Sequence, residues 1–153
     1  MLPLSHILVN SLILYPFIRK KSKKAFAYVA FGSILPDLVD KPLGLIIYHA
    51  FGNGRLVAHS LLFNVLLLLV CIAAGEGRWL IGVSSLLHLV EDQMWKMPDV
   101  LFFPFLGPIH MRHRENFTER INSLIHHLYN PFYLFLNVAG FVFVVYILLK
   151  KRN

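Results

Sequence analysis

Residues of the types that bind metals recur along the chain, and the most informative pair is His88 and Asp92. Residues four apart on a helix project from one face about one turn apart, which is the spacing that two ligands of one metal need. Glu91, about 100° around the same helix, is expected to lie off that face. The pair by itself is not specific, so its meaning depends on which other residues the fold brings to it.

Four further candidates precede this pair in the chain. Asp37 and Asp40 follow Pro36, where a break in a helix would let their carboxylates turn inward. His6 and His59 each stand at the start of an apolar segment. Imidazole and carboxylate together suit zinc, manganese or iron, and the carboxylate oxygens also suit magnesium. We therefore expect a divalent metal, zinc first, with manganese or magnesium as alternatives.

The composition indicates a membrane protein. Of the 153 residues, 57% are apolar and 15% are charged, which leaves little polar surface for a soluble domain. The net charge of +7 would suggest nucleic acid in a soluble protein, but here Lys and Arg gather between apolar runs, as topology signals do. We expect one membrane-embedded domain over residues 1–153, with membrane lipids as partners and no nucleic acid.

Five apolar segments predict an all-α fold, a polytopic membrane bundle of about five helices. They are Pro3–Ile18, Ala25–Leu35, Leu56–Ala74, Trp79–Met94 and Phe132–Leu149. A bilayer core of about 30 Å takes about 20 helical residues, and fewer where a helix end lines protein or water. The second helix is expected to stop or kink at Pro36, after which Leu43–Phe51 either continues it or lies re-entrant. Leu101–Ile109 contains Pro104 and Pro108, which predict a short segment near the interface.

The distribution of basic residues predicts the orientation. Nine lie on one side of the predicted bundle: Arg19, Lys20, Lys21, Lys23, Lys24, Arg78, Lys150, Lys151 and Arg152. The opposite side holds the other six, Lys41, Arg55, Lys96, Arg112, Arg114 and Arg120, together with most of the acidic residues. Cytoplasmic loops carry an excess of Lys and Arg. We expect an integral protein of the cell membrane with its N-terminus outside and its C-terminus in the cytoplasm.

This topology brings the candidate ligands to one level. In an up-and-down bundle, the starts of odd-numbered helices and the ends of even-numbered helices meet at one face. Five candidates then reach the outer face: His6, Asp37, His59, His88 and Asp92. Asp40 and His49 are expected nearby. Ionisable groups are costly within a membrane, about 2.5 to 3.5 kcal/mol each at its centre on insertion scales, so such a convergence predicts a site.

The succession of motifs resembles the YdjM-like family of membrane-bound metal-dependent hydrolases. The motifs are Ser5-His6, Gly32-Ser33-x-x-Pro36-Asp37, Arg55-x-x-x-His59-Ser60, and His88-x-x-x-Asp92 followed by Leu101-Phe102-Phe103-Pro104, and they cover the chain to about Gly107. That family is similar to the zinc-dependent phospholipase C and nuclease group, in which clustered His and Asp residues hold zinc ions that activate water against a phosphate ester. The resemblance implies a zinc site and a phosphoester substrate.

Two positions depart from the family pattern. Family members often have a histidine where this chain has Gly54, and a threonine where it has Ala58. One expected ligand is therefore absent, so the site holds fewer metals or a substitute such as His49 or His110. The spacing from Asp37 to Asp40 is also one residue longer than the frequent Pro-Asp-x-Asp.

Two functions from different classes follow. The first is a metal-dependent hydrolase of a phosphoester, such as a lipid head group, at the outer face of the membrane. Asp40 would be a further ligand or the catalytic base, and Arg55, with Arg112 and Arg114 as further candidates, would bind phosphate oxygens. The alternative is a non-catalytic membrane protein whose His and Asp residues hold a structural metal or hydrogen-bond between helices. Metal content measured together with turnover separates the two.

Overall fold

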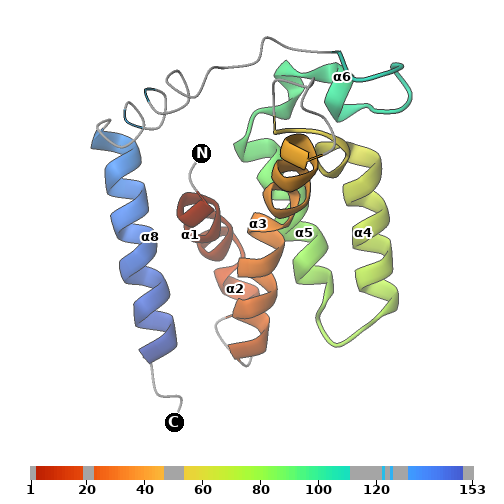
Figure 1. Ribbon diagram of the computed structural model, residues 1–153. Coiled ribbons are helices and arrows are strands. Elements are labelled where there is room, and N and C mark those ends of the chain that lie inside the picture. Colours follow the sequence, from red (N-terminus) through yellow and green to blue (C-terminus); the bar gives the residue numbers. More distant parts are fainter. Residues whose placement is uncertain are drawn as a thin grey trace.

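The fold is taken from a computed structural model, and the residues described are 3–18, 23–46, 54–110, 122, 125 and 131–149. All regular structure in these residues is helical, as predicted (Figure 1). The α-helices are α1 (Pro3–Ile13), α2 (Tyr15–Ile18), α3 (Lys23–Ile46), α4 (Leu61–Ala73), α5 (Trp79–Glu91), α6 (Pro98–Leu101) and α8 (Pro131–Leu149), and the 3-10 turns are η1 (Val57–His59) and η2 (Met94–Lys96).

The helices pack side by side, with α3 between α1 and α5 (Figure 1). Helix α8 covers the other side of α1, and α4 covers the other side of α5. Helices α4 and α5 form an antiparallel hairpin whose turn lies at the end of the molecule opposite α6. The beginning of α4 and the end of α5 therefore lie at the same end, as the predicted up-and-down order requires.

Glycines allow the central helices to approach closely. A Cβ atom on Gly32 of α3 would lie 2.3 Å from the carbonyl oxygen of Ile81 in α5. A Cβ atom on Gly82 of α5 would lie 2.5 Å from the Cα atom of Leu68 in α4. Neither distance is compatible with a side chain. These two contacts bring α3 and α4 directly against the backbone of α5, and thus close to the residues at its end.

Buried polar side chains tie the same helices together. Asn10 of α1 donates from Nδ2 to Ser33 Oγ in α3 at 2.9 Å and to the carbonyl of Ser84 in α5 at 3.1 Å. Asn64 of α4 accepts a hydrogen bond of 2.5 Å from Ser85 Oγ in α5. All five side chains are buried, so these bonds satisfy groups that would be costly to leave unpaired.

Two of the predicted helix boundaries were wrong. The first predicted helix is divided at Leu14, because Pro16 has no N–H group to continue the hydrogen-bond ladder of α1. The second does not stop at Leu35 but runs through Pro36 and Pro42 to Ile46. Burial of Pro36 against the neighbouring helices outweighs the hydrogen bond that its ring removes.

The remaining predictions concern the bilayer. The sequence predicted five membrane-spanning helices, and none of the helices in the described ranges combines the length and the apolar composition that crossing a membrane requires. The segment Leu101–Ile109 forms no long helix, as predicted: α6 ends at Leu101, and a turn follows. Val100 of α6 packs with Leu89 and Met94 in a small buried cluster beyond the end of α5.

Candidate metal centre

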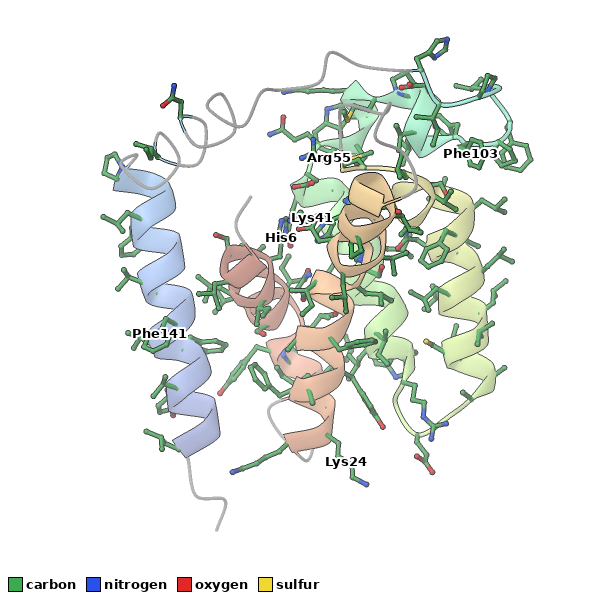
Figure 2. All side chains as sticks on the ribbon, in the orientation of Figure 1. His6, Lys24, Lys41, Arg55, Phe103 and Phe141 are labelled. Carbon is green, nitrogen blue, oxygen red and sulfur yellow. The ribbon has the colours of Figure 1, made fainter. Side chains whose placement is uncertain are left out.

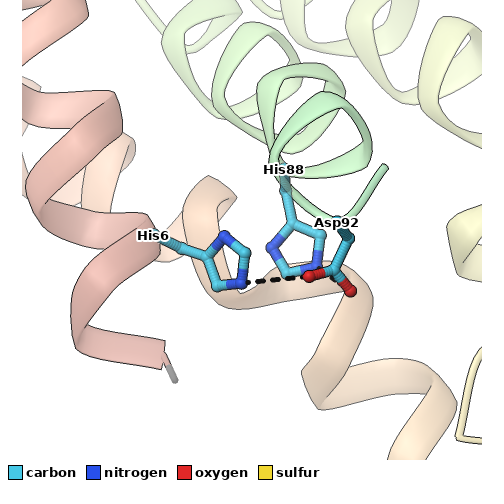
Figure 3. A group of neighbouring side chains, drawn as sticks. All are labelled: His6, His88 and Asp92. Atoms are coloured by element: carbon cyan, nitrogen blue, oxygen red, sulfur yellow. Dashed lines mark ion pairs between the residues drawn. The ribbon is translucent and has the colours of Figure 1, made fainter. Parts of the chain in front are cut away.

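All five predicted ligands come together at the end of α5. His6 lies in α1, Asp37 in α3, His59 at the end of η1, His88 in the last turn of α5, and Asp92 directly after it. They form two overlapping groups whose ligand atoms lie within 4.8 Å of one another: His6, His88 and Asp92 form one, and Asp37, His59 and His88 form the other. Figure 3 shows the first group, with His6 and Asp92 on either side of His88.

The rings of His59 and His88 are held through their Nδ1 atoms. His59 Nδ1 lies 2.7 Å from Asp40 Oδ2, and His88 Nδ1 lies 2.7 Å from the carbonyl oxygen of Ser33. A carbonyl oxygen can only accept a hydrogen bond, and so can an ionised carboxylate, so each Nδ1 carries the proton. The lone pair of each ring is therefore on Nε2, the atom available to a metal.

The ring of His6 is held by a residue that the sequence analysis placed off the ligand face. Its Nδ1 forms a very short hydrogen bond with Glu91 Oε2. Glu91 is not a proposed ligand, but it fixes the His6 ring. In the sequence, this role of Glu91 was indicated by its position next to Asp92 at a helix end. The role of Glu91 can be recognised only when the position of α1 is known, and the spacing of residues along α5 does not give that position.

The three Nε2 atoms are buried and unsatisfied. Within the described residues, Nε2 of His6, His59 and His88 has no hydrogen-bond partner, and the three side chains are buried completely or nearly so. Leaving a polar group buried without a partner costs about 1 to 3 kcal/mol. Three such atoms facing one place therefore fit a site whose ligand supplies the missing interactions.

The carboxylates lie at distances that suit a metal shared with these atoms. Asp92 Oδ1 lies 3.5 Å from His6 Nε2, and Asp92 Oδ2 lies 3.9 Å from His88 Nε2 and 4.0 Å from His59 Nε2. Asp37 Oδ1 lies 3.7 Å from His59 Nε2. Tetrahedral ligands at about 2.1 Å from zinc are about 3.4 Å apart, so only a small contraction would be needed.

The two groups overlap at His88 and cannot each hold an ion through its ring. His88 belongs to both groups, and its Nδ1 is occupied by Ser33. Its Nε2 has one lone pair and so can bind one metal. The two groups therefore cannot both use His88 as a ligand, and because they share this ring we treat the five donors as one centre.

Asp40 lies behind His59 and does not face the centre. It accepts hydrogen bonds from the backbone N–H groups of Leu56, Ala58 and His59 at 2.6, 2.9 and 3.1 Å, in addition to the contact with the His59 ring. It is completely buried. These contacts shape the turn that carries His59, so they favour a positioning role over the predicted role of base or ligand.

Arg55 contacts the centre through Asp92. Its Nε and Nη2 atoms lie 2.9 and 2.7 Å from Asp92 Oδ2. Burial raises the pKa of the Asp92 carboxyl, but the positive charges around it, Arg55 foremost, outweigh this effect and hold that pKa well below its usual range. Asp92 is therefore a carboxylate at neutral pH, the form that a metal requires.

The candidate substitutes for the missing ligand do not join the centre in the described residues. His110 is 76% exposed and lies 3.6 Å from Asp99 Oδ2, outside both groups. His49, Arg112 and Arg114 lie outside the described residues.

The comparisons with known proteins support the resemblance found in the motifs. A model of the YdjM inner membrane protein family matches residues 1–152. No curated protein and no solved structure matches the chain. The match extends over all five residues of the centre, and the family description specifies no reaction.

Proposed function

The chain belongs to the YdjM inner membrane protein family, and from this membership and the centre at the end of α5 we propose that it is a membrane-bound, metal-dependent hydrolase of phosphoesters. The family description agrees with the membrane localisation expected from composition. The observation that carries the proposal is the set of three buried Nε2 atoms that have no hydrogen-bond partner among the described residues and that face two carboxylates.

Each residue of the centre has a distinct role in this proposal. His6, His59, His88, Asp37 and Asp92 provide the donors for one divalent metal, zinc first and manganese or magnesium as alternatives. Such a metal supplies a water of lowered pKa and polarises the phosphoryl oxygen. Asp40 and Glu91 orient the rings of His59 and His6. Arg55, one-third exposed, is close enough to Asp92 to contact an anionic substrate beside the metal.

The test is turnover of a phosphodiester by the purified full-length protein. We expect hydrolysis of bis(p-nitrophenyl) phosphate by the zinc-loaded protein, its loss on chelation and its return with metal. His88→Ala should reduce the rate at least about a hundredfold, because it removes a donor shared by both groups. His110→Ala is the matched control, since His110 is exposed and lies outside the centre. Zinc binding without turnover of any phosphoester would reject the hydrolase proposal.

One observation favours the alternative, a structural metal site. Structural zinc sites are closed by four protein ligands, whereas catalytic sites have three and keep one position for water. The centre offers five donors, enough to close a tetrahedral site. Asp37 is the most exposed of the five, at 13%, so its displacement is the step that would open a position for water. If the Asp37→Asn variant retains its metal, and water reaches the metal in this variant but not in the unsubstituted protein, the result would support a structural role for the metal.

We also propose that the centre faces the outside of the inner membrane. The described basic residues Lys23, Lys24 and Arg78 lie at the end of the helices opposite the centre, where Figure 2 shows Lys24 far from His6, Lys41 and Arg55. The positive-inside rule assigns that basic end to the cytoplasm. A reporter fused to the C-terminus should be active only inside the cell, and activity only outside would reverse the assignment.

A further inference from the structure

The side chains around the centre differ in their exposure to solvent. Lys41 is 53% exposed, Arg55 is 34% exposed and Asp37 is 13% exposed, whereas the rings of His59 and His88 are completely buried. The two cations are therefore the most exposed of these side chains, and we call their side of the centre its entrance. Figure 2 shows Lys41 and Arg55 at the same end of the molecule as His6.

Each cation contacts one of the two carboxylates that face the histidines. Lys41 Nζ lies 2.6 Å from Asp37 Oδ2, while the other oxygen of Asp37 faces His59. Arg55 contacts Asp92 Oδ2, while Asp92 Oδ1 lies nearest to His6. The two carboxylates thus connect the buried histidines to two positive charges at the entrance.

We propose that Lys41 selects an anionic substrate, by binding an oxygen of a phosphate group that approaches the metal from the solvent side. This inference rests on the proposed function, because it requires a metal in the centre. The Lys41 ammonium has three donors, and its contact with Asp37 uses one of them. Its flexible stem lets the ammonium follow a ligand without moving α3.

A purely structural role explains Lys41 less well. An exposed ion pair between residues four apart on a helix contributes little to stability, so the fold does not depend on it. The stem of Lys41 also lies against the turn that leads to His59, since its Cγ atom would be 3.4 Å from a Cβ atom on Gly54. Both this packing contact and the ion pair with Asp37 therefore place the Lys41 side chain near the entrance.

The experiment measures phosphate binding without turnover. The full-length protein is loaded with cobalt(II), and inorganic phosphate is titrated while the visible absorption of the cobalt is followed at constant ionic strength. We expect Lys41→Met to bind cobalt with unchanged stoichiometry and phosphate about tenfold more weakly. Lys41→Arg, which keeps the charge, should restore the affinity to within about threefold of the unsubstituted protein.

Lys24→Met is the matched control, because it makes the same change of charge at an exposed residue at the opposite end of the molecule (Figure 2). It should leave phosphate binding unchanged. Equal phosphate affinity in Lys41→Met and the unsubstituted protein would overturn the inference, and so would an equal loss in both variants or no phosphate binding at all. Failure of the unsubstituted protein to bind cobalt would instead overturn the proposed function.

Discussion

His59 and Asp40 form a hydrogen bond of 2.7 Å between two completely buried side chains, and the same carboxylate accepts three backbone N–H groups of the turn that carries His59. The carboxylate thus fixes both the ring and its backbone. In metal sites such an outer contact sets which ring nitrogen is free and where it points. The orientation of His59 toward the centre depends on Asp40.

Asp40→Asn should therefore weaken zinc binding about 10- to 100-fold. An amide has one accepting oxygen where the carboxylate has two, so the turn and the ring can no longer both be satisfied. Competition with a chelator of known affinity measures the change. Asp99→Asn, which alters an aspartate outside the centre, should leave zinc affinity unchanged. Equal affinities in the two variants would contradict a positioning role for Asp40.

Glu91→Gln should weaken zinc binding about tenfold, because the His6 ring loses the carboxyl group that fixes its orientation. Glu76→Gln is the control at the opposite end of α5, where Glu76 pairs with Arg78 and is 72% exposed. Zinc titrations of both variants give the comparison. If Glu91→Gln bound zinc as tightly as Glu76→Gln, the contact between Glu91 and His6 would have no part in the metal site.

Part of this site could be predicted from the sequence, and the reason is periodicity. The spacing of His88 and Asp92 on one helix, and the alternation of helix directions, were enough to predict that five residues from four predicted helices come together. The roles of Asp40 and Glu91 could not be predicted in the same way. They depend on the path of the turn before His59 and on the position of α1, which tertiary packing determines.

The helix boundaries also divide into those that the sequence predicts and those that depend on tertiary packing. The spacing of apolar residues predicted α4, α5 and α8 to within a few residues. The sequence left open whether the helix continues beyond Pro36, because a local rule that ends helices at proline can be overridden where the chain packs closely on both sides. Gly32, four residues earlier, marks that close packing.

Gly32→Ala should destabilise the protein by about 1 to 3 kcal/mol, because its Cβ atom would overlap the backbone of α5 at Ile81. The thermal midpoint in detergent should fall by several degrees. Zinc affinity should fall as well, since His88 is held by the carbonyl of the neighbouring Ser33. Gly54→Ala, whose Cβ atom meets only ordinary contacts, should change neither quantity by a comparable amount. A midpoint for Gly32→Ala that equals that of Gly54→Ala would contradict the close approach.

The substitutions His88→Ala and Asp92→Ala should each remove most of the bound zinc, and their effects on zinc affinity should not add. Each removes a donor of the same centre, so the second acts on a site that is already damaged. Comparing zinc affinity in the two single variants and the double variant measures this coupling. Fully additive losses would show that the two residues do not bind one ion.

The most direct test of the account is the number of zinc ions bound per chain, measured on purified, zinc-soaked protein and on its His88→Ala and His110→Ala variants. One ion shared by all five donors predicts about one zinc per chain in the unsubstituted protein and in His110→Ala, because His110 is exposed outside the centre. His88→Ala should hold close to none. A zinc content near zero in the unsubstituted protein, or an unchanged content in His88→Ala, would contradict the metal centre.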